Sequence, residues 1–330
     1  MDNAYSDAVE SLLHDHCTPA VVRGIEAGAD ASALWTLLHE SGFADCLLPE
    51  AALTLHDVFP MLRVMGQYVL PVPLAQTMFA RAVLHAAGAQ IPDGPIALAS
   101  VDGQARVRVA DGATAQWFLI QHGAEARLVR RDAADVRPTG VHGDLTVSVA
   151  AWSTSSAPAA QSAKSLALAP GALRTMGAAL HAAQLAGAMA HTFEMTLQYA
   201  NDRTQFGRPI GKFQAIQHQV SVMAEHVAAA RMAAQLACAA DGWQPDPMRA
   251  AIGKFNTSDA VTPVTSIAHA VHGAIGITAE YDLQLLTRRL HAWRMADGSE
   301  RYWAGEIGAA ACNDGGGAVD LIRRWSGEAV

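Results

Sequence analysis

Charged residues are scarce in this chain, and positive charge is the scarcer sign. Of the 330 residues, 16% are charged and 51% are hydrophobic, and the formal net charge is −8. Nucleic-acid binding rests on a surplus of lysine and arginine, so a nucleic-acid backbone is excluded as the main partner. A monomer must cover itself with groups that water solvates, so the low charge also indicates that some apolar surface meets another subunit.

Cysteine is rare as well, and its spacing excludes two kinds of site. The cysteines are far apart and form no Cys-x-x-Cys pair; they are Cys17, Cys46, Cys238 and Cys312. This pattern indicates neither a zinc site nor a disulfide framework, and we expect reduced, mostly buried thiols. Histidine pairs lack a third ligand at a useful spacing, so we predict no metal site.

The sequence patterns of a secretion signal and of a membrane span are also missing. The N-terminus begins with acidic residues in place of a basic stretch followed by an apolar one, and no window holds ~20 uninterrupted apolar residues. We therefore predict no membrane span and expect a cytoplasmic protein.

Helical periodicity dominates what is present, with one interruption that is typical of strands. Apolar residues recur at helical spacing from about Ala31 to Ala87. After Pro92-Asp-Gly-Pro95 come short β-type stretches divided by turns, namely Ala105–Val109, Trp117–Ile120 and Leu145–Val149. The serine- and alanine-rich segment from Ala151 to Ser165 is interpreted as a connection.

Three long helical patterns follow that connection. The first begins at Pro170-Gly171 and runs towards Asn201, the second follows Phe213 and stops near Asp241-Gly242, and the third runs from Met248 to His272. Small residues on the first helix let a neighbouring helix approach closely. The fold class is therefore α+β and mostly α, with an N-terminal helical domain over 1–92, a small β domain over 93–165 and an antiparallel helical bundle over 166–330.

The loop from Tyr199 to Gln214, which joins the first two long helices, is the most informative segment. It holds Arg203 and two glycines, and such a loop can bind a phosphate group. A guanidinium suits a planar, doubly charged partner. The alternative is that Arg203 is a solvated arginine at a helix C-terminus, where a cation is favoured.

This loop and a second motif resemble the acyl-CoA dehydrogenase family. The matching residues are Arg203-x-Gln-Phe-Gly-x-Pro-Ile210-x-x-Phe-Gln214, His272-Gly-Ala-Ile-Gly-Ile-Thr-Ala-Glu280 and Arg288, with weaker likeness from Leu34 to Gly42 and at Pro71-x-Pro73. The resemblance covers most of the chain and is specific in its C-terminal half. It implies a helical domain, a central β domain and a C-terminal four-helix bundle.

The resemblance also implies a cofactor and partners. Such enzymes use FAD to oxidise an acyl-CoA thioester to the α,β-enoyl thioester, and an electron-transfer flavoprotein accepts the electrons. Arg203 would contact the FAD pyrophosphate across a subunit interface, with Gln205, Phe206 and Gln214 around the adenine end. Gly273 and Ser299 complete the set of predicted cofactor-binding residues.

Asp297 occupies the position at which most of the family carries its catalytic glutamate. The base must take the α-proton of a thioester, which requires a polarised carbonyl and a desolvated carboxylate. The alternative is a capping box at a helix start, formed by Asp297 and Glu300. A second base position, used by some members, falls near Gly177, which has no carboxylate.

Three arginines after the second motif form a basic cluster. Arg288, Arg289 and Arg294 could in principle meet a CoA phosphate, but we interpret them as a solvated helix face.

Departures from the family pattern concern the flavin. The segment that usually holds the flavin ring is missing around Ala97–Gly103, and Ala270 replaces a common glutamine. With these departures the chain resembles short, steroid-type members of the family, which implies weak binding of its own flavin. The resemblance also implies a bulky or cyclic acyl-CoA substrate. The expected assembly is a heterotetramer with a second acyl-CoA dehydrogenase subunit, or else a homo-oligomer. Two alternatives stay open: a non-catalytic subunit that completes a partner's FAD site, and a nitroalkane-oxidase-like flavoprotein.

Overall fold

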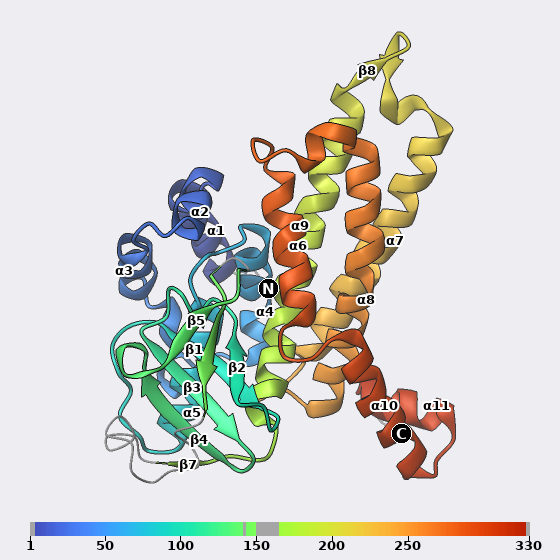
Figure 1. Cartoon of the computed structure of the whole chain (residues 1–330). Helices are drawn as coiled ribbons and strands as arrows, with labels where there is room; N and C mark the ends of the chain where they lie inside the picture. The colour runs from blue at the N-terminus through green and yellow to red at the C-terminus, as the bar shows by residue number, and fades with distance from the viewer. Residues whose placement is uncertain (1–3, 141–142, 150–164, 328–330) are drawn as a thin grey trace.

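The N-terminal helices and two small sheets form one side of the molecule, and a bundle of long helices forms the other (Figure 1). This arrangement comes from a computed structural model that describes residues 4–140, 143–149 and 165–327. The predicted connection lies outside the described residues from 151 to 164. The fold class predicted from the sequence is confirmed.

Five helices precede the first strand. They are α1 (Ala4–His16), α2 (Pro19–Glu26), α3 (Ser32–Glu40), α4 (Leu55–Gln67) and α5 (Leu74–Ala86). Local chemistry sets their starts, as α4 shows. The Thr54 hydroxyl accepts a hydrogen bond from the Asp57 amide at 3.2 Å, and the Asp57 carboxylate accepts one from the Thr54 amide at 2.9 Å. This capping box satisfies two amides that a helix start leaves without partners.

The β layer consists of two sheets packed face to face. The first has the order β1 (Ile96–Val101), β3 (Trp117–His122), β4 (Glu125–Arg130), β7 (Leu166–Ala167); the second has the order β2 (Arg106–Val109), β6 (Leu145–Ser148), β5 (Val136–Pro138). Only β1 and β3 are parallel within these two sheets. Alternate residues such as Val107, Phe118 and Val147 form a core between the sheets. The sequence predicted β2, β3 and β6, but it did not predict β1 or β4.

The bundle is built from α6 (Ala172–Asp202), α7 (Gln214–Ala237), α8 (Pro247–His272) and α9 (Leu283–Met295), followed by α10 (Glu300–Asp314) and α11 (Ala318–Ser326). Asp246 caps α8 by accepting hydrogen bonds from the Met248 and Arg249 amides at 3.0 and 2.8 Å. The predicted four-helix bundle is therefore confirmed. Helix α7 ends at Ala237, four residues before the predicted stop at Asp241.

Glycines on α4 and α6 let these two helices cross closely, as the small-residue seam predicted. A Cβ added at Gly187 would lie 3.0 Å from the Gln67 amide nitrogen and would overlap the Arg63 carbonyl. A Cβ at Gly66 would overlap the backbone of Gln184 in the same way. Neither position has room for a side chain, so the N-terminal helices pack directly on the bundle.

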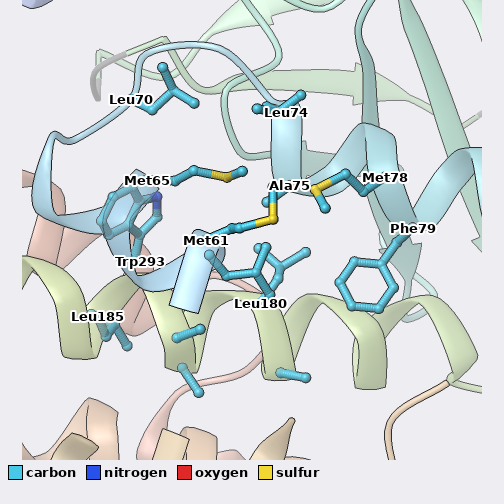
Figure 2. Close-up of a cluster of buried hydrophobic side chains, with 14 of the residues drawn as sticks. Met61, Met65, Leu70, Leu74, Ala75, Met78, Phe79, Leu180, Leu185 and Trp293 are labelled. Carbon is cyan, nitrogen blue, oxygen red and sulfur yellow. The ribbon is translucent and has the colours of Figure 1, made fainter. Parts of the chain in front are cut away.

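Large apolar side chains fill the region beside this crossing. Figure 2 shows methionine, leucine and phenylalanine side chains from α4 and α5 gathered over α6, and Trp293 of α9 lies at one side of the cluster, near Met65. Met61, Met65, Met78 and Phe79 are fully buried here. Each such side chain contributes roughly 1.5–3 kcal/mol when it leaves water. This cluster joins the N-terminal helices to α6 and α9.

A buried ion-pair centre joins all three parts of the molecule. Arg289 of α9 donates to the Asp111 carboxylate at 2.5 Å, in the turn after β2, and to the Glu26 carboxylate of α2 at 2.9 Å. The Arg289 side chain is 2% exposed, so the interpretation of Arg289 as part of a solvated face is wrong. Burial raises the pKa of Asp111, and the charge of Arg289 opposes that shift. A buried guanidinium requires such partners.

One stretch, Pro247–Ile277, is long and apolar enough to match a membrane span by length and composition alone within the described residues. It contains α8, which packs against α6 and α7 inside the bundle. The core helix of a bundle meets the same criterion.

Replacing Arg289 by methionine should strongly destabilise the fold, because the Asp111 carboxylate would remain buried without its guanidinium and the Glu26 carboxylate would keep only its contact with Arg288. We expect the free energy of unfolding to fall by about 3–5 kcal/mol. Arg288→Met is the matched control, since Arg288 also pairs with Glu26 but is 44% exposed; it should cost below about 1 kcal/mol. Urea unfolding measures both, and equal losses in the two variants would contradict the role of Arg289.

Candidate active site

A pocket of about 370 Å³ lies where the α9–α10 loop meets the β layer. Its volume is at the low end of the range for small-molecule sites. Polar and charged side chains dominate its wall; they include Ser100, Asp102, Arg106, Arg108, Arg174, Asp297 and Tyr302. The predicted base therefore lines a pocket between the sheets and the bundle.

The carboxylate of Asp297 faces the start of α6. Its side chain is 15% exposed, and its Oδ2 lies 2.9 Å from Nδ1 of His181, which is 1% exposed. The backbone at Asp297 is left-handed, with φ of 52°, and Gly298 follows with φ of 102°. A left-handed aspartate costs energy and persists only where its surroundings fix it. The Asp297 carbonyl accepts a hydrogen bond from the Trp303 indole at 3.1 Å, which supplies one such constraint.

Gly177 makes the space that this carboxylate occupies. A Cβ added at Gly177 would overlap the Asp297 carboxyl carbon and would lie 2.7 Å from Oδ1. The two base positions considered from the sequence are therefore adjacent in space. One position has the carboxylate and the other has no side chain, so a single acid group fits.

The capping interpretation of Asp297 is wrong. The N-cap of α10 is Ser299, two residues later, and its side chain makes no capping hydrogen bond. Glu300, the other member of the supposed box, pairs with Arg294, whose Nε donates to Oε2 at 3.0 Å. The Asp297 carboxylate accepts no backbone amide in the described chain. The left-handed turn directs it towards α6.

His181 is a site residue that sequence reasoning missed. Two acceptors converge on its Nδ1, the Gly177 carbonyl at 2.9 Å and the Asp297 carboxylate at 2.9 Å. We therefore assign the proton to Nδ1. Nε2 is buried and has no hydrogen-bond partner among the described residues. The available signal was position, because residue 181 lies one helical turn after Gly177 on the same face of α6.

The other predicted cofactor-binding residues lie at the far end of the bundle (Figure 1). Thr204–Gln205 (β8) and Arg208–Pro209 (β9) form a short hairpin beyond α6. Phe206 at its tip has a left-handed φ of 51° and is 92% exposed. Arg203, Gln205, Gln214 and Gly273 are exposed too. Arg203 caps α6, and its carbonyl accepts a hydrogen bond from the Ile210 amide at 2.8 Å.

Helix α6 separates the two groups of predicted residues. Arg203 follows Gly177 by 26 residues, which places the two roughly 39 Å apart at about 1.5 Å per helical residue. Ser299 lies beside Asp297, whereas the remaining cofactor-binding candidates lie beyond the opposite end of α6. One ligand cannot touch both groups within one chain.

The pocket beside Asp297 offers partners to a polar ring system. The Ser100 hydroxyl, at the end of β1, is buried and has no hydrogen-bond partner in the described part of the chain, and it lines the pocket. The three arginines are already paired, Arg106 with Asp135, Arg108 with Asp144, and Arg174 with Asp102. Ala97–Gly103, which stand where the family has its flavin-holding segment, form most of β1 and the turn that follows it. The pocket therefore offers few free polar partners to a bound ring system.

A second cleft and the arrangement of possible metal ligands were the other candidates for a site in the described residues, and neither adds residues to the pocket beside Asp297. A more open cleft of about 1120 Å³, near Leu84, Trp117 and Arg130, is lined by none of the predicted site residues. Across residues 4–140, 143–149 and 165–327, no group of three His, Cys, Asp or Glu side chains is placed to hold a metal ion.

Comparison with known proteins identifies relatives of the whole chain. Residues 172–311 match the family model described as acyl-CoA dehydrogenase, C-terminal domain. The acyl-CoA dehydrogenase IpdE2 of Mycolicibacterium smegmatis is 31% identical over 306 residues, which are 86% of this chain and 90% of that protein. IpdE2 of Mycobacterium tuberculosis is 32% identical, with 86% and 89% covered.

Solved structures share the fold at lower identity. The Tcur3481-Tcur3483 steroid ACAD G363A variant superposes with a TM-score of 0.77 at 22% identity, covering 93% of this chain and 96% of that one. The ChsE4-ChsE5 complex from Mycobacterium tuberculosis superposes with a TM-score of 0.76 at 19% identity, covering 96% and 99%.

Gly177→Ala should displace the Asp297 carboxylate, because the new methyl group occupies its place. We expect the free energy of unfolding to fall by about 1–3 kcal/mol and a crystal structure to show the Asp297–His181 contact broken. Gly305→Ala is the control: it adds the same methyl group to α10, where nothing lies within 4 Å, and should stabilise by roughly 0.5–1 kcal/mol. An unmoved Asp297 in a fully stable Gly177→Ala protein would contradict this reading.

Proposed function

The chain belongs to the acyl-CoA dehydrogenase family, and from that premise we propose that it is the base-bearing subunit of an FAD enzyme that desaturates a bulky or cyclic acyl-CoA thioester. The flavin-dependent oxidoreductase class follows from the family. The choice of FAD, the substrate and the subunit role are the proposal. The observation that carries it is the Asp297 carboxylate, held at a pocket wall by a buried imidazole in space that Gly177 leaves open.

Asp297 is placed to remove the α-proton. Its carboxylate is largely shielded from water, with 15% of the side chain exposed, so little bulk water reaches the position of proton transfer. Nδ1 of His181 lies 2.9 Å from Oδ2, a polar contact between the imidazole and the carboxylate, and Oδ1 has no hydrogen-bond partner within the described residues. One oxygen therefore lies against the imidazole while the other is available to the substrate. Aspartate is one methylene shorter than glutamate, so the thioester must lie closer to the loop than a glutamate base would need.

When bound, the flavin accepts the hydride that leaves the β-carbon. Ser100 would hold it in the pocket of this chain, and Arg203 with Gln205, Phe206 and Gln214 would contact a dinucleotide held mainly by a neighbouring chain. The pocket of about 370 Å³ is small for a whole dinucleotide. This size supports a site that two chains complete.

The length of α6 supports an oligomer. Because Arg203 lies roughly 39 Å from Gly177, whose neighbour in space is Asp297, Arg203 and Asp297 of one chain contribute to different sites. The structural neighbours include a two-protein complex and a steroid enzyme by name. We propose a heterotetramer with a second acyl-CoA dehydrogenase subunit, a steroid-like CoA thioester as substrate, an electron-transfer flavoprotein as acceptor and a cytoplasmic location. A homo-oligomer is the other arrangement that this geometry permits.

A non-catalytic role is the second candidate, and one observation favours it. The segment of the family that holds the flavin ring is absent around β1, where Ala97–Gly103 offer few polar groups. In that case this chain completes a partner's site through Arg203 and abstracts no proton.

Asp297→Asn separates the two candidates. In the flavin-loaded assembly, loss of the carboxylate should lower the rate of flavin reduction by roughly 10²–10⁴-fold, while flavin content and binding of the CoA ester stay unchanged. Stopped-flow absorbance of the flavin measures the rate. Unchanged reduction would remove Asp297 from the mechanism and leave the non-catalytic role.

His181 should matter through the contact of its Nδ1 with the Asp297 carboxylate. Leucine fills a similar volume without a polar atom, so His181→Leu should slow flavin reduction by roughly 10- to 100-fold, the effect of losing one polar contact to a charged group. An asparagine side chain places an amide nitrogen near the position of Nδ1, so His181→Asn should recover most of the rate. Equal rates in the two variants would show that only packing at residue 181 matters.

A further inference from the structure

Lys254 of α8 has an ammonium group that is fully buried among oxygen atoms. Its side chain is 0% exposed. Nζ donates to the carbonyls of Trp293 at 3.0 Å, Arg294 at 2.9 Å and Gly298 at 3.1 Å, and to the Ser258 hydroxyl at 2.8 Å. Three of these four acceptors are backbone atoms on either side of Asp297. Lys254 therefore contacts both ends of the segment that carries the carboxylate.

We propose that Lys254 is a positioning residue, which fixes the backbone of residues 294–298 so that the Asp297 carboxylate faces the pocket. The inference rests on the proposed function, because it assigns Lys254 to the reaction through Asp297. Within the described part of the chain, Gly298 is the pocket-lining residue to which Lys254 donates, and the ammonium group is fully buried and is not placed to contact substrate.

The loop needs such a constraint because its conformation is unfavourable. Asp297 and Gly298 both have positive φ, 52° and 102°. A non-glycine residue in that region costs about 1–3 kcal/mol and relaxes unless neighbouring contacts hold it. Lys254 holds the loop from inside the bundle, and the Trp303 indole holds the Asp297 carbonyl from α10. The two contacts approach the loop from different helices, which leaves it one conformation.

The identity of residue 254 fits this role. The last carbonyls of a helix lack the full set of amide partners, and at the end of α9 the Trp293 carbonyl accepts the Ala296 amide at 3.2 Å; a lysine ammonium supplies three further donors at one point. Burial lowers the pKa of Lys254 to about 7, while the charges of Asp297 and Glu300 oppose the shift and Arg294 adds to it. Burying this group is therefore costly, and a methionine of similar length would avoid the cost. Methionine, however, would donate no hydrogen bonds to the three carbonyls.

Lys254→Met tests the proposal in the flavin-loaded assembly. We expect kcat to fall by about 10²-fold, the effect of a misplacement of about 1 Å, with KM changed less than about twofold, since no substrate contact is lost. We also expect faster amide hydrogen exchange in residues 294–299 than in the wild type. Thr257→Val is the matched control: it removes a buried hydroxyl on the same helix that donates only to the Gly253 and Lys254 carbonyls of α8, at 2.8 and 3.3 Å, and it should leave kcat and exchange near wild type.

The results of the Lys254→Met experiment can be distinguished from those of the Asp297→Asn experiment, which tests the base. If Lys254→Met folds and its exchange in residues 294–299 is unchanged, the positioning role is overturned, whatever its turnover. If Asp297→Asn lowers turnover but Lys254→Met does not, the role is overturned as well. If Asp297→Asn has no effect, the proposed function fails, and the exchange measurement alone decides whether Lys254 holds the loop. Should Lys254→Met fail to fold, Lys254→Gln, which keeps one donor group, is expected to give an intermediate exchange rate, and a wild-type rate would overturn the role.

Discussion

The position of helix α9 is the constraint on which the site depends, and Arg289 fixes it. This guanidinium is buried between carboxylates of α2 and of the turn after β2. A charge in the interior must meet its counter-charges at hydrogen-bond distance, so few placements of α9 satisfy both partners. The loop that carries Asp297 begins where α9 ends. The same ion pairs that join the three parts of the molecule therefore determine where the carboxylate is presented.

Donors from different helices converge on that loop. His181 comes from α6 and contacts the carboxylate, Lys254 comes from α8 and binds the backbone on both sides, and Trp303 comes from α10 and binds the Asp297 carbonyl. Gly177 contributes by having no side chain. An unfavourable left-handed aspartate is stable here because several packed elements agree on its position. The geometry of the candidate site thus depends on the bundle, although the carboxylate itself lies on a loop.

The two ends of α6 have different roles. One end contacts the carboxylate, and the other carries an exposed hairpin whose Phe206 is almost wholly exposed. At and after the start of α7, the apolar side chains of Phe213, Ile216 and Val220 are only half-buried in the single chain. A chain with few charges and such a surface has apolar area left to cover, as its composition indicated. These features agree with a protein that contributes to sites in two directions.

The sequence by itself determined the helical and β regions, the hairpin loop with Arg203, the family and the position of Asp297. It determined them because periodicity, turn residues and motif spacing are local properties of the chain. It could not separate a base from a helix cap at Asp297, since Asp-x-x-Glu fits both, and it misread Arg289 as a solvated residue. Only the tertiary structure excluded the helix cap, placed Arg289 in the interior and brought forward His181 and Lys254. Their partners lie on other helices, and the energy of a buried polar group depends on which atoms packing brings to it rather than on its neighbours in the chain.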